Sequence, residues 1–188
     1  MTNITSKPRT LAIISMVFMA AFARLIPHPW NFTPIAAMAL FGGVYFKDKA
    51  LAFVITILSL IVSDVLTVMF INNHFTTLSN YFVSYGVLSI YGCFILTIGI
   101  GFLLRKKTNL LTVVGASLVS STLFYLVTNY PCWVGNPIYP KNIEGLTACY
   151  IAGLEFYRNG ILGDLFYSGV LFGGFYLARL KFPILAKV

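Results

Sequence analysis

The stretch that decides the fold lies at residues 50–71 and reads ALAFVITILSLIVSDVLTVMFI. It holds a single charged side chain, Asp64, and a helix of about 20 apolar residues is long enough to cross the hydrocarbon core of a bilayer. The rest of the chain has the same character, because 59% of its 188 residues are hydrophobic and only 10% are charged. A soluble domain usually carries about 25% charged residues, so we expect lipid around this protein.

Further apolar runs flank this stretch, and together they predict six helices that cross the membrane. The run from Ile35 to Phe46 is short, because a helix of this length spans roughly 18 Å and the hydrocarbon core is roughly 30 Å thick. It is either extended by residues 32–34 or forms a partial span tucked among its neighbours, and we count it as a crossing. The prediction is an all-α membrane protein of one domain, residues 1–188, with spans at about 10–26, 32–46, 50–71, 84–104, 110–130 and 160–180.

Basic residues gather in alternate connections between these spans. If the second run did not cross, the cluster at 105–107 would lie on the opposite side from the N-terminal one, so the charges favour six crossings. Cytoplasmic loops are enriched in Lys and Arg, so both termini are expected in the cytoplasm. The placement of these basic residues therefore sets the orientation and accounts for the formal net charge of +8, and no nucleic-acid partner is expected. The residues concerned are Lys7, Arg9, Lys47, Lys49, Arg105, Lys106, Lys107, Arg179, Lys181 and Lys187.

The three connections predicted on the outer side are longer and rich in proline and aromatic residues. They cover residues 27–34, 72–83 and 131–159, and within the last of them residues 143–157 could form a short helix over the bundle. Loops on a rigid scaffold commonly carry binding sites, which places the expected site on the outer side. The alternative is that their Trp and Tyr residues form only an interfacial belt.

Three cysteines invite different interpretations. Cys132 and Cys149 lie in the third outer connection, where an oxidising compartment would allow a disulfide, and two unpaired thiols are an equal alternative. Cys93 lies within the fourth span, roughly 18 Å along the helix from the inner basic cluster. A lone cysteine in an apolar helix is most simply a small hydrophobic residue. If the other two pair, however, Cys93 is the one free thiol.

Two carboxylates, Asp64 and Asp164, fall within predicted spans. An acid inside a membrane is costly to place there and by default suggests a functional site. We expect Asp164 to form a structural ion pair with Arg24 or to cap a helix, and a proton relay is the alternative. His28 and His74 lie in different outer connections and could bind a metal.

Several catalytic signatures are missing from the sequence. It contains no Walker A loop, no His-Glu-x-x-His metalloprotease motif and no Gly-x-Ser-x-Gly nucleophile elbow. The sequence therefore favours a binding protein or a transporter over an ordinary enzyme.

The stretch at residues 24–43, RLIPHPWNFTPIAAMALFGG, resembles the signature of a family of small bacterial membrane proteins. That family is related to the substrate-binding S-components of energy-coupling-factor (ECF) vitamin transporters. The resemblance implies a six-transmembrane-helix bundle of ECF S-component type in the bacterial inner membrane, with a vitamin pocket open to the outside. Further matching segments are LIVSD at 60–64, LVTN at 126–129, ACY at 148–150 and GDL at 163–165.

Within this family, the best match is to solitary cobalamin transporters of the BtuM type. The resemblance implies uptake of cobalamin (vitamin B12), with Cys93 in Tyr91-Gly92-Cys93-Phe94 as the cobalt ligand. Thiolates are good ligands for polarisable metal centres, and cysteine ligation that displaces cyanide implies a decyanation of cyanocobalamin. The first span lacks an Ala-x-x-x-Ala pair for docking an ECF coupling module, which favours solitary function.

Further residues are expected around a bound corrinoid. Tyr85 and Tyr91 share a helix with Cys93, and polar or aromatic groups on the outer side could satisfy the corrin amides and cover its faces. One alternative is another vitamin or cofactor precursor on the same scaffold, and another is a membrane enzyme that uses Asp64 and Asp164. The expected outer wall consists of Asn31, Phe32, Asn129, Tyr130 and Trp133.

Overall fold

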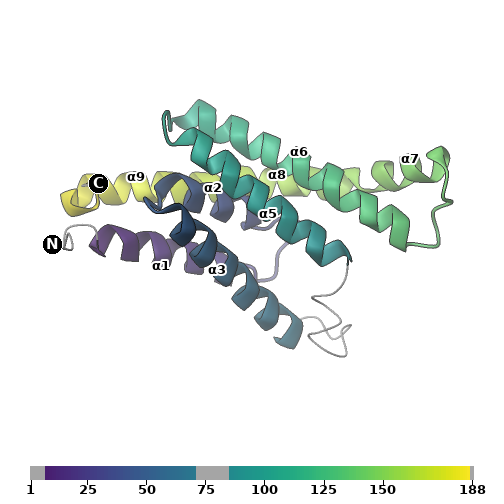
Figure 1. Ribbon diagram of the computed structural model, residues 1–188, viewed down its shortest axis with the longest axis horizontal. Coiled ribbons are helices and arrows are strands. Elements are labelled where there is room, and N and C mark those ends of the chain that lie inside the picture. The colour runs from purple at the N-terminus through teal and green to yellow at the C-terminus, as the bar shows by residue number, and fades with distance from the viewer. Residues whose placement is uncertain (1–6, 71–84, 187–188) are drawn as a thin grey trace.

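The computed structural model describes residues 7–70 and 85–186, and these residues form an assembly of helices without a strand (Figure 1). The element labels follow Figure 1. The α-helices are α1 (Lys7–Ala23), α2 (Ile35–Tyr45), α3 (Lys49–Phe70), α5 (Tyr85–Leu104), α6 (Leu110–Gly135), α7 (Ile143–Ala152), α8 (Leu154–Ser168) and α9 (Gly174–Lys181). A π-helical segment, Gly169–Gly173, joins α8 to α9, and a short 3₁₀ turn, Pro183–Leu185, follows α9.

Four helical segments are long and apolar enough to cross a membrane. They are α3, α5 from Gly86 onward, α6, and the run from α7 to α9. Only 28–39% of their most apolar windows is buried inside the protein. Large apolar side chains therefore face outward, and Leu103, Leu110 and Leu111 are each more than three-quarters exposed. An outer surface of this kind fits lipid, and the protein is a membrane protein.

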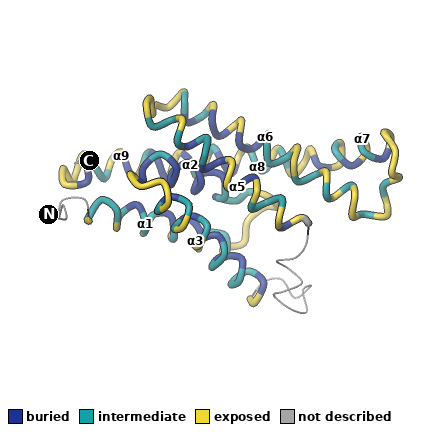
Figure 2. The backbone as a smooth tube through the Cα atoms, in the orientation of Figure 1, coloured by how far each residue is buried: buried dark blue, intermediate teal, exposed yellow. Residues whose placement is uncertain are grey.

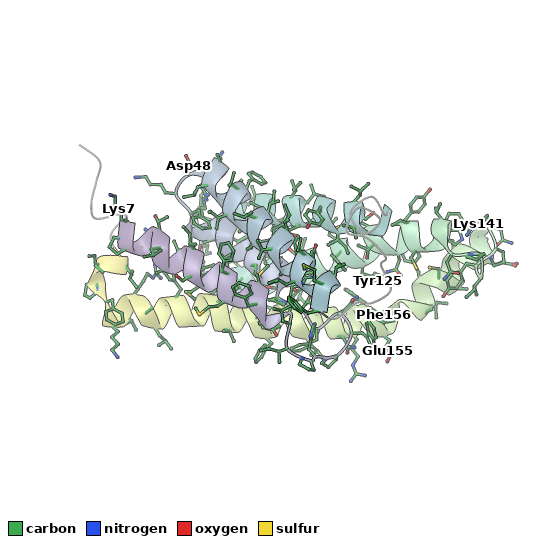
Figure 3. All side chains as sticks on the ribbon, turned by 90° about the horizontal axis from the view of Figure 1, so that it is seen from below. Lys7, Asp48, Tyr125, Lys141, Glu155 and Phe156 are labelled. Carbon is green, nitrogen blue, oxygen red and sulfur yellow. The ribbon has the colours of Figure 1, made fainter. Side chains whose placement is uncertain are left out.

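Basic residues from several elements gather at one end of the molecule, where Arg105 binds the C-terminal end of α2 and Arg179 lies over the ring of Tyr45. Figure 1 shows both termini at this end, and Figure 3 shows Lys7 and Asp48 there, with Lys141 at the opposite end. The expected gathering of basic residues at one end is therefore present, with Lys141 at the other end, and the expected outer connection at residues 72–83 lies outside the described residues. The two ends are called the basic end and the outer end below.

Helix boundaries differ from the prediction mainly at the outer end. α6 was expected to stop near residue 130, but it continues through Pro131 to Gly135. Proline removes one backbone donor, yet the amide of Asn136 still closes the last turn on the carbonyl of Cys132 at 3.0 Å. The predicted connection at 131–159 is thus largely helical. α8 begins at Leu154, six residues before the expected sixth span.

The short helix α2 forms the centre of the core. Nine of its eleven residues are buried, and Figure 2 shows it as a buried segment among its neighbours. It begins at Ile35, so residues 32–34 do not extend the helix as expected. A helix of this size is only about 16 Å long. The helix is thus shorter than the predicted crossing at 32–46 and is tucked among its neighbours, and its crossing of the membrane stays a prediction.

α2 lies in backbone contact with α5 through a pair of glycines. A Cβ atom on Gly43 would stand 2.4 Å from the carbonyl oxygen of Ile98 and 2.9 Å from the Cα of Gly101. A Cβ on Gly101 would stand 2.7 Å from the carbonyl oxygen of Leu40. Small residues allow such close approach in membrane helices, where association depends on van der Waals contact.

Both ends of α2 are bound by charged side chains from other helices. At its C-terminal end, the Nε of Arg105 donates to the carbonyl of Gly43 at 2.8 Å, and its Nη2 donates to the carbonyl of Phe46 at 2.6 Å. At its N-terminal end, the carboxylate of Asp164 accepts a hydrogen bond from the amide of Ala36. A cation at the C-terminus and an anion at the N-terminus complement the helix dipole, so α2 is stabilised although it ends inside the protein.

Candidate functional site

A cavity of about 180 Å³ lies at the outer end, between the N-terminus of α2 and helices α5, α6 and α8. We call it the outer cavity. Tyr125 of α6 and Phe156 of α8, both labelled in Figure 3, line it from different helices. Nine of its fifteen lining residues carry side chains that can form hydrogen bonds. The polar residues concerned are Arg24, Asn31, Thr33, Ser121, Tyr125, Thr128, Asn129, Tyr157 and Asp164.

Asp164 forms the floor of the outer cavity and is only 7% exposed. One carboxylate oxygen accepts a hydrogen bond from the Ser121 hydroxyl at 2.6 Å, and the carboxylate also accepts from the Ala36 amide. The expected ion pair between Asp164 and Arg24 is wrong, and the alternative of a carboxylate that caps a helix is confirmed. The acid therefore joins α8 to both α6 and α2.

Arg24 instead pairs with Asp64 of α3. Its Nη1 lies 2.6 Å from the Asp64 carboxylate, and the two side chains are 12% and 2% exposed. The same guanidinium donates to Ser63, while the hydroxyl of Tyr91 donates to the second Asp64 oxygen at 2.9 Å. This network connects α1, α3 and α5, and Arg24 also lines the outer cavity. Asp64 is thus engaged in a structural ion pair.

Two of the predicted wall residues, Asn31 and Asn129, do line the outer cavity. Asn31 adopts a left-handed backbone conformation with φ of 61°, which asparagine tolerates better than most residues. The amide of Asn129 donates to the carbonyl of Tyr125 at 2.7 Å. Its oxygen lies so close to Gly153 that a Cβ there would stand only 2.4 Å away. Asn129 is therefore held at the junction of α7 and α8.

Cys93 is buried on α5, with 2% of its surface exposed, and it is not among the residues that line the outer cavity. It shares one helix face with Gly86, Ser89 and Ile90, which precede it by seven, four and three positions. Ile90 lines the outer cavity. Ser89 lines a second hollow of about 740 Å³ between the outer ends of α5 and α6, which we call the lateral groove. The thiol thus lies one helical turn deeper than the wall between the two hollows.

The remaining predicted residues are distributed around these hollows. The ring of Phe32 packs on Phe166 and Tyr167, with centroids 5.7 Å apart in both cases. Tyr130 lines the lateral groove, and its ring lies 5.8 Å from that of Trp133.

Trp133 and Tyr91 do not line the outer cavity. The indole of Trp133 donates to the carbonyl of Pro140 at 2.9 Å, which holds the connection between α6 and α7. Tyr91 is bound to Asp64, as described above. Tyr85 begins α5, and its side chain lies outside the part of the chain that the structure describes.

Several cavity residues were missed in the sequence, although a signal for them exists. Ser117, Ser121, Tyr125 and Asn129 recur every four residues along α6, which places them on one helix face. Three of them, from Ser121 onward, line the outer cavity. A polar stripe in an otherwise apolar span indicates a face that is turned away from lipid. Tyr157, which stacks on Tyr125 at 4.7 Å between ring centroids, has no comparable signal.

The cysteines and histidines at the outer end form no metal site within residues 7–70 and 85–186, where no group of three or more metal-ligating side chains occurs. The thiols of Cys132 and Cys149 are both free but interact with each other. The Nδ1 atom of His28 lies 2.7 Å from the carbonyl of Ile26. His74 falls outside the described residues.

Comparison with known proteins assigns the chain to a family without assigning an activity. No curated protein and no solved structure matches it. The model of one family, described as a family of unknown function (DUF6580), matches residues 4–185, which is nearly the whole chain. The chain therefore belongs to the family of unknown function DUF6580.

Proposed function

We propose that this protein is a six-helix solute-uptake protein of ECF S-component type in a bacterial inner membrane, and that it binds cobalamin from the outer side. The observation that carries the proposal is the outer cavity with its many hydrogen-bonding side chains, which lies at the N-terminal end of α2, whereas Arg105 and Arg179 lie at the C-terminal end of that helix. Positive charge favours the cytoplasmic side, so the cavity would face the compartment from which a nutrient arrives. Solitary function, without a coupling module, remains part of the proposal.

In this proposal Cys93 is the ligand of the corrinoid cobalt. Its helix face reaches the outer end through Ile90, Ser89 and Gly86, and a Cβ built on Gly86 meets no atom within 4 Å. The thiolate sulfur donates an electron pair to cobalt, and a cyanide ligand leaves with the pair of its own bond to the metal. The thiol proton passes to water or to the cyanide. No change of oxidation state is needed.

The size of the outer cavity requires a rearrangement on binding. Its volume of about 180 Å³ is below the roughly 300–1,000 Å³ of pockets for drug-sized ligands, and a corrinoid is larger still. The lateral groove adds about 740 Å³. Ser89 and Ile90 line the two spaces and are adjacent in sequence, so the outer turns of α5 form the wall between them. Displacement of these turns would join the spaces directly above Cys93.

The proposal predicts a spectral change that depends on Cys93. Purified protein incubated with cyanocobalamin should retain the corrinoid with a shifted absorbance spectrum, because sulfur replaces a cobalt ligand. Cys93→Ala should show the unshifted spectrum or lose the corrinoid. The control is Cys132→Ala, which removes an exposed thiol at the outer end and should behave as wild type. Failure of the wild-type protein to retain any corrinoid would end the cobalamin assignment.

A smaller ligand in the outer cavity is the second candidate, and the cavity volume together with the absence of Cys93 from its lining favours it. The ligand would then be another vitamin or cofactor precursor with several hydrogen-bonding groups. Mass spectrometry of small molecules released from the purified protein should find such a compound. Asn129→Leu should lose it and Asn136→Leu, a change at a half-buried position just after the same helix and outside the cavity lining, should keep it. A compound retained equally by both variants would exclude this cavity as its site.

A further inference from the structure

A third hollow, of about 520 Å³, lies near the basic end, between the first turns of α6 and the segment from α8 to α9. We call it the inner groove. Its length is apolar, with Leu110, Val113, Leu165 and Phe172 among its lining residues. Its polar end is formed by Tyr45, Thr108, Asn109 and Arg179. The groove is therefore amphipathic along its length, with the charged end towards the basic side of the bundle.

Part of the inner groove is lined by backbone without side chains. The π-helical segment Gly169–Gly173 lies along it, and both of its terminal glycines line the groove. A Cβ built on either Gly169 or Gly173 meets no atom within 4 Å. Close packing of two helices therefore does not explain these glycines, in contrast to Gly43 and Gly101. Single π-helical turns within α-helices occur frequently at functional sites.

Arg179 lines the charged end of the inner groove, and the Arg9 guanidinium lies near it without lining the groove itself. Burial lowers the pKa of the Arg9 guanidinium, and the positive charge of Arg179 lowers it further. Arg179 lies over the rings of Tyr45 and Phe175, at 5.7 and 5.4 Å from their centroids. Within the described residues, Arg179 forms no ion pair with a carboxylate. Like charges brought together beside an apolar channel are stabilised by a bound anion.

We propose that the inner groove binds an anionic phospholipid, with its phosphate at Arg179 and Arg9 and one acyl chain along the apolar walls towards Phe172. Basic pockets between transmembrane helices commonly take anionic lipid head groups on the positive side of a membrane protein. The positive charge of the arginines favours an anionic head group, and the open space beside Gly169 and Gly173 accommodates the acyl chain of the lipid. This site is independent of the outer cavity and of whatever that cavity binds.

Native mass spectrometry of the delipidated full-length protein, titrated with phosphatidylglycerol, tests the site. Arg179→Gln should weaken binding by about fivefold, the effect of losing one basic residue near an anionic lipid. Its control, Lys181→Gln, removes the same charge from the same helix outside the groove. Gly173→Leu should fill the apolar channel and also weaken binding. Its control is Gly115→Leu, which adds the same side chain at an exposed position of α6 with open space around it.

Further titrations distinguish an anionic lipid from other possible occupants of the inner groove. Phosphatidylcholine at the same concentrations should bind more weakly than phosphatidylglycerol, and inorganic phosphate should not compete with the lipid. Equal binding of the two lipids, or full competition by phosphate, would overturn the proposal. It would also be overturned if Arg179→Gln and Lys181→Gln bind the lipid equally well. A further contradicting result would be that Arg179→Gln and Gly173→Leu change the oligomeric state of the protein and leave lipid binding unchanged. In that case the groove is the contact between two copies of this chain.

Discussion

Gly43→Ala is expected to lower the stability of the protein by about 3 kcal/mol, the upper part of the range for overpacking a core. The added methyl group would meet the backbone oxygen of Ile98 at 2.4 Å, and a backbone atom cannot move away by a change of rotamer. The helices α2 and α5 would have to separate, although their contact forms the centre of the core. The measurement is the unfolding temperature in detergent, followed by the fluorescence of Trp30 and Trp133.

Gly99→Ala is the matched control for this change. Gly99 lies on α5, two residues before Gly101, and a Cβ there meets no atom within 4 Å. Alanine is a better helix former than glycine by up to about 1 kcal/mol, so this variant should melt at the wild-type temperature or slightly above it. Equal unfolding temperatures for Gly43→Ala and Gly99→Ala would contradict the close contact between α2 and α5.

Asp64→Ala is expected to cost about 3–5 kcal/mol, because it leaves the Arg24 guanidinium buried without its counter-ion. The cost comes from the unpaired charge more than from the lost attraction. Replacing both partners, in Arg24→Leu with Asp64→Leu, should therefore recover much of the loss. Thermal unfolding of the wild type, Arg24→Leu, Asp64→Leu and the double variant that combines these two changes gives the coupling energy directly.

This cycle also separates a structural role of Asp64 from a chemical one. If the carboxylate served as a proton relay or catalytic acid, the double variant would regain stability while transport or catalysis stayed lost. Recovery of both stability and uptake in the double variant would show that Asp64 serves only to neutralise Arg24. Wild-type stability in Asp64→Ala would contradict the ion pair itself.

The long spans could be predicted from the sequence because they depend on composition alone. α3 occupies Lys49–Phe70 where residues 50–71 were expected, and α5 ends at Leu104 as expected. The outer ends of α6 and α8 could not be placed, because Pro131 ordinarily marks a helix end and residues 154–159 include Glu155 and Arg158. A helix that continues beyond the hydrocarbon core carries no hydropathy signal there.

Contacts between side chains of different helices were harder to predict than the positions of the helices along the sequence. Asp64 is the sixteenth of the 22 residues of α3 and Asp164 the eleventh of the 15 residues of α8, and these positions along the helices did not decide which of the two acids faces Arg24. Which acid pairs with Arg24 depends on how each helix is rotated about its axis. The sequence indicates this rotation for only part of the bundle. The polar residues that recur every four positions from Ser117 to Asn129 are one such indication, and they would have identified the face of α6 that lines the outer cavity.

The dependence of α2 on Arg105 and Asp164 has a consequence for the biogenesis of the protein. α2 leaves the ribosome before either side chain exists, and at about 16 Å it is too short to settle across a bilayer on its own. Its C-terminal carbonyls gain a partner when residue 105 has been synthesised, and its N-terminal amides gain one only when residue 164 follows. The helix at the centre of the core is thus among the first segments made and among the last to be completed. Its final position is fixed after synthesis of most of the chain, by the helices that close around it.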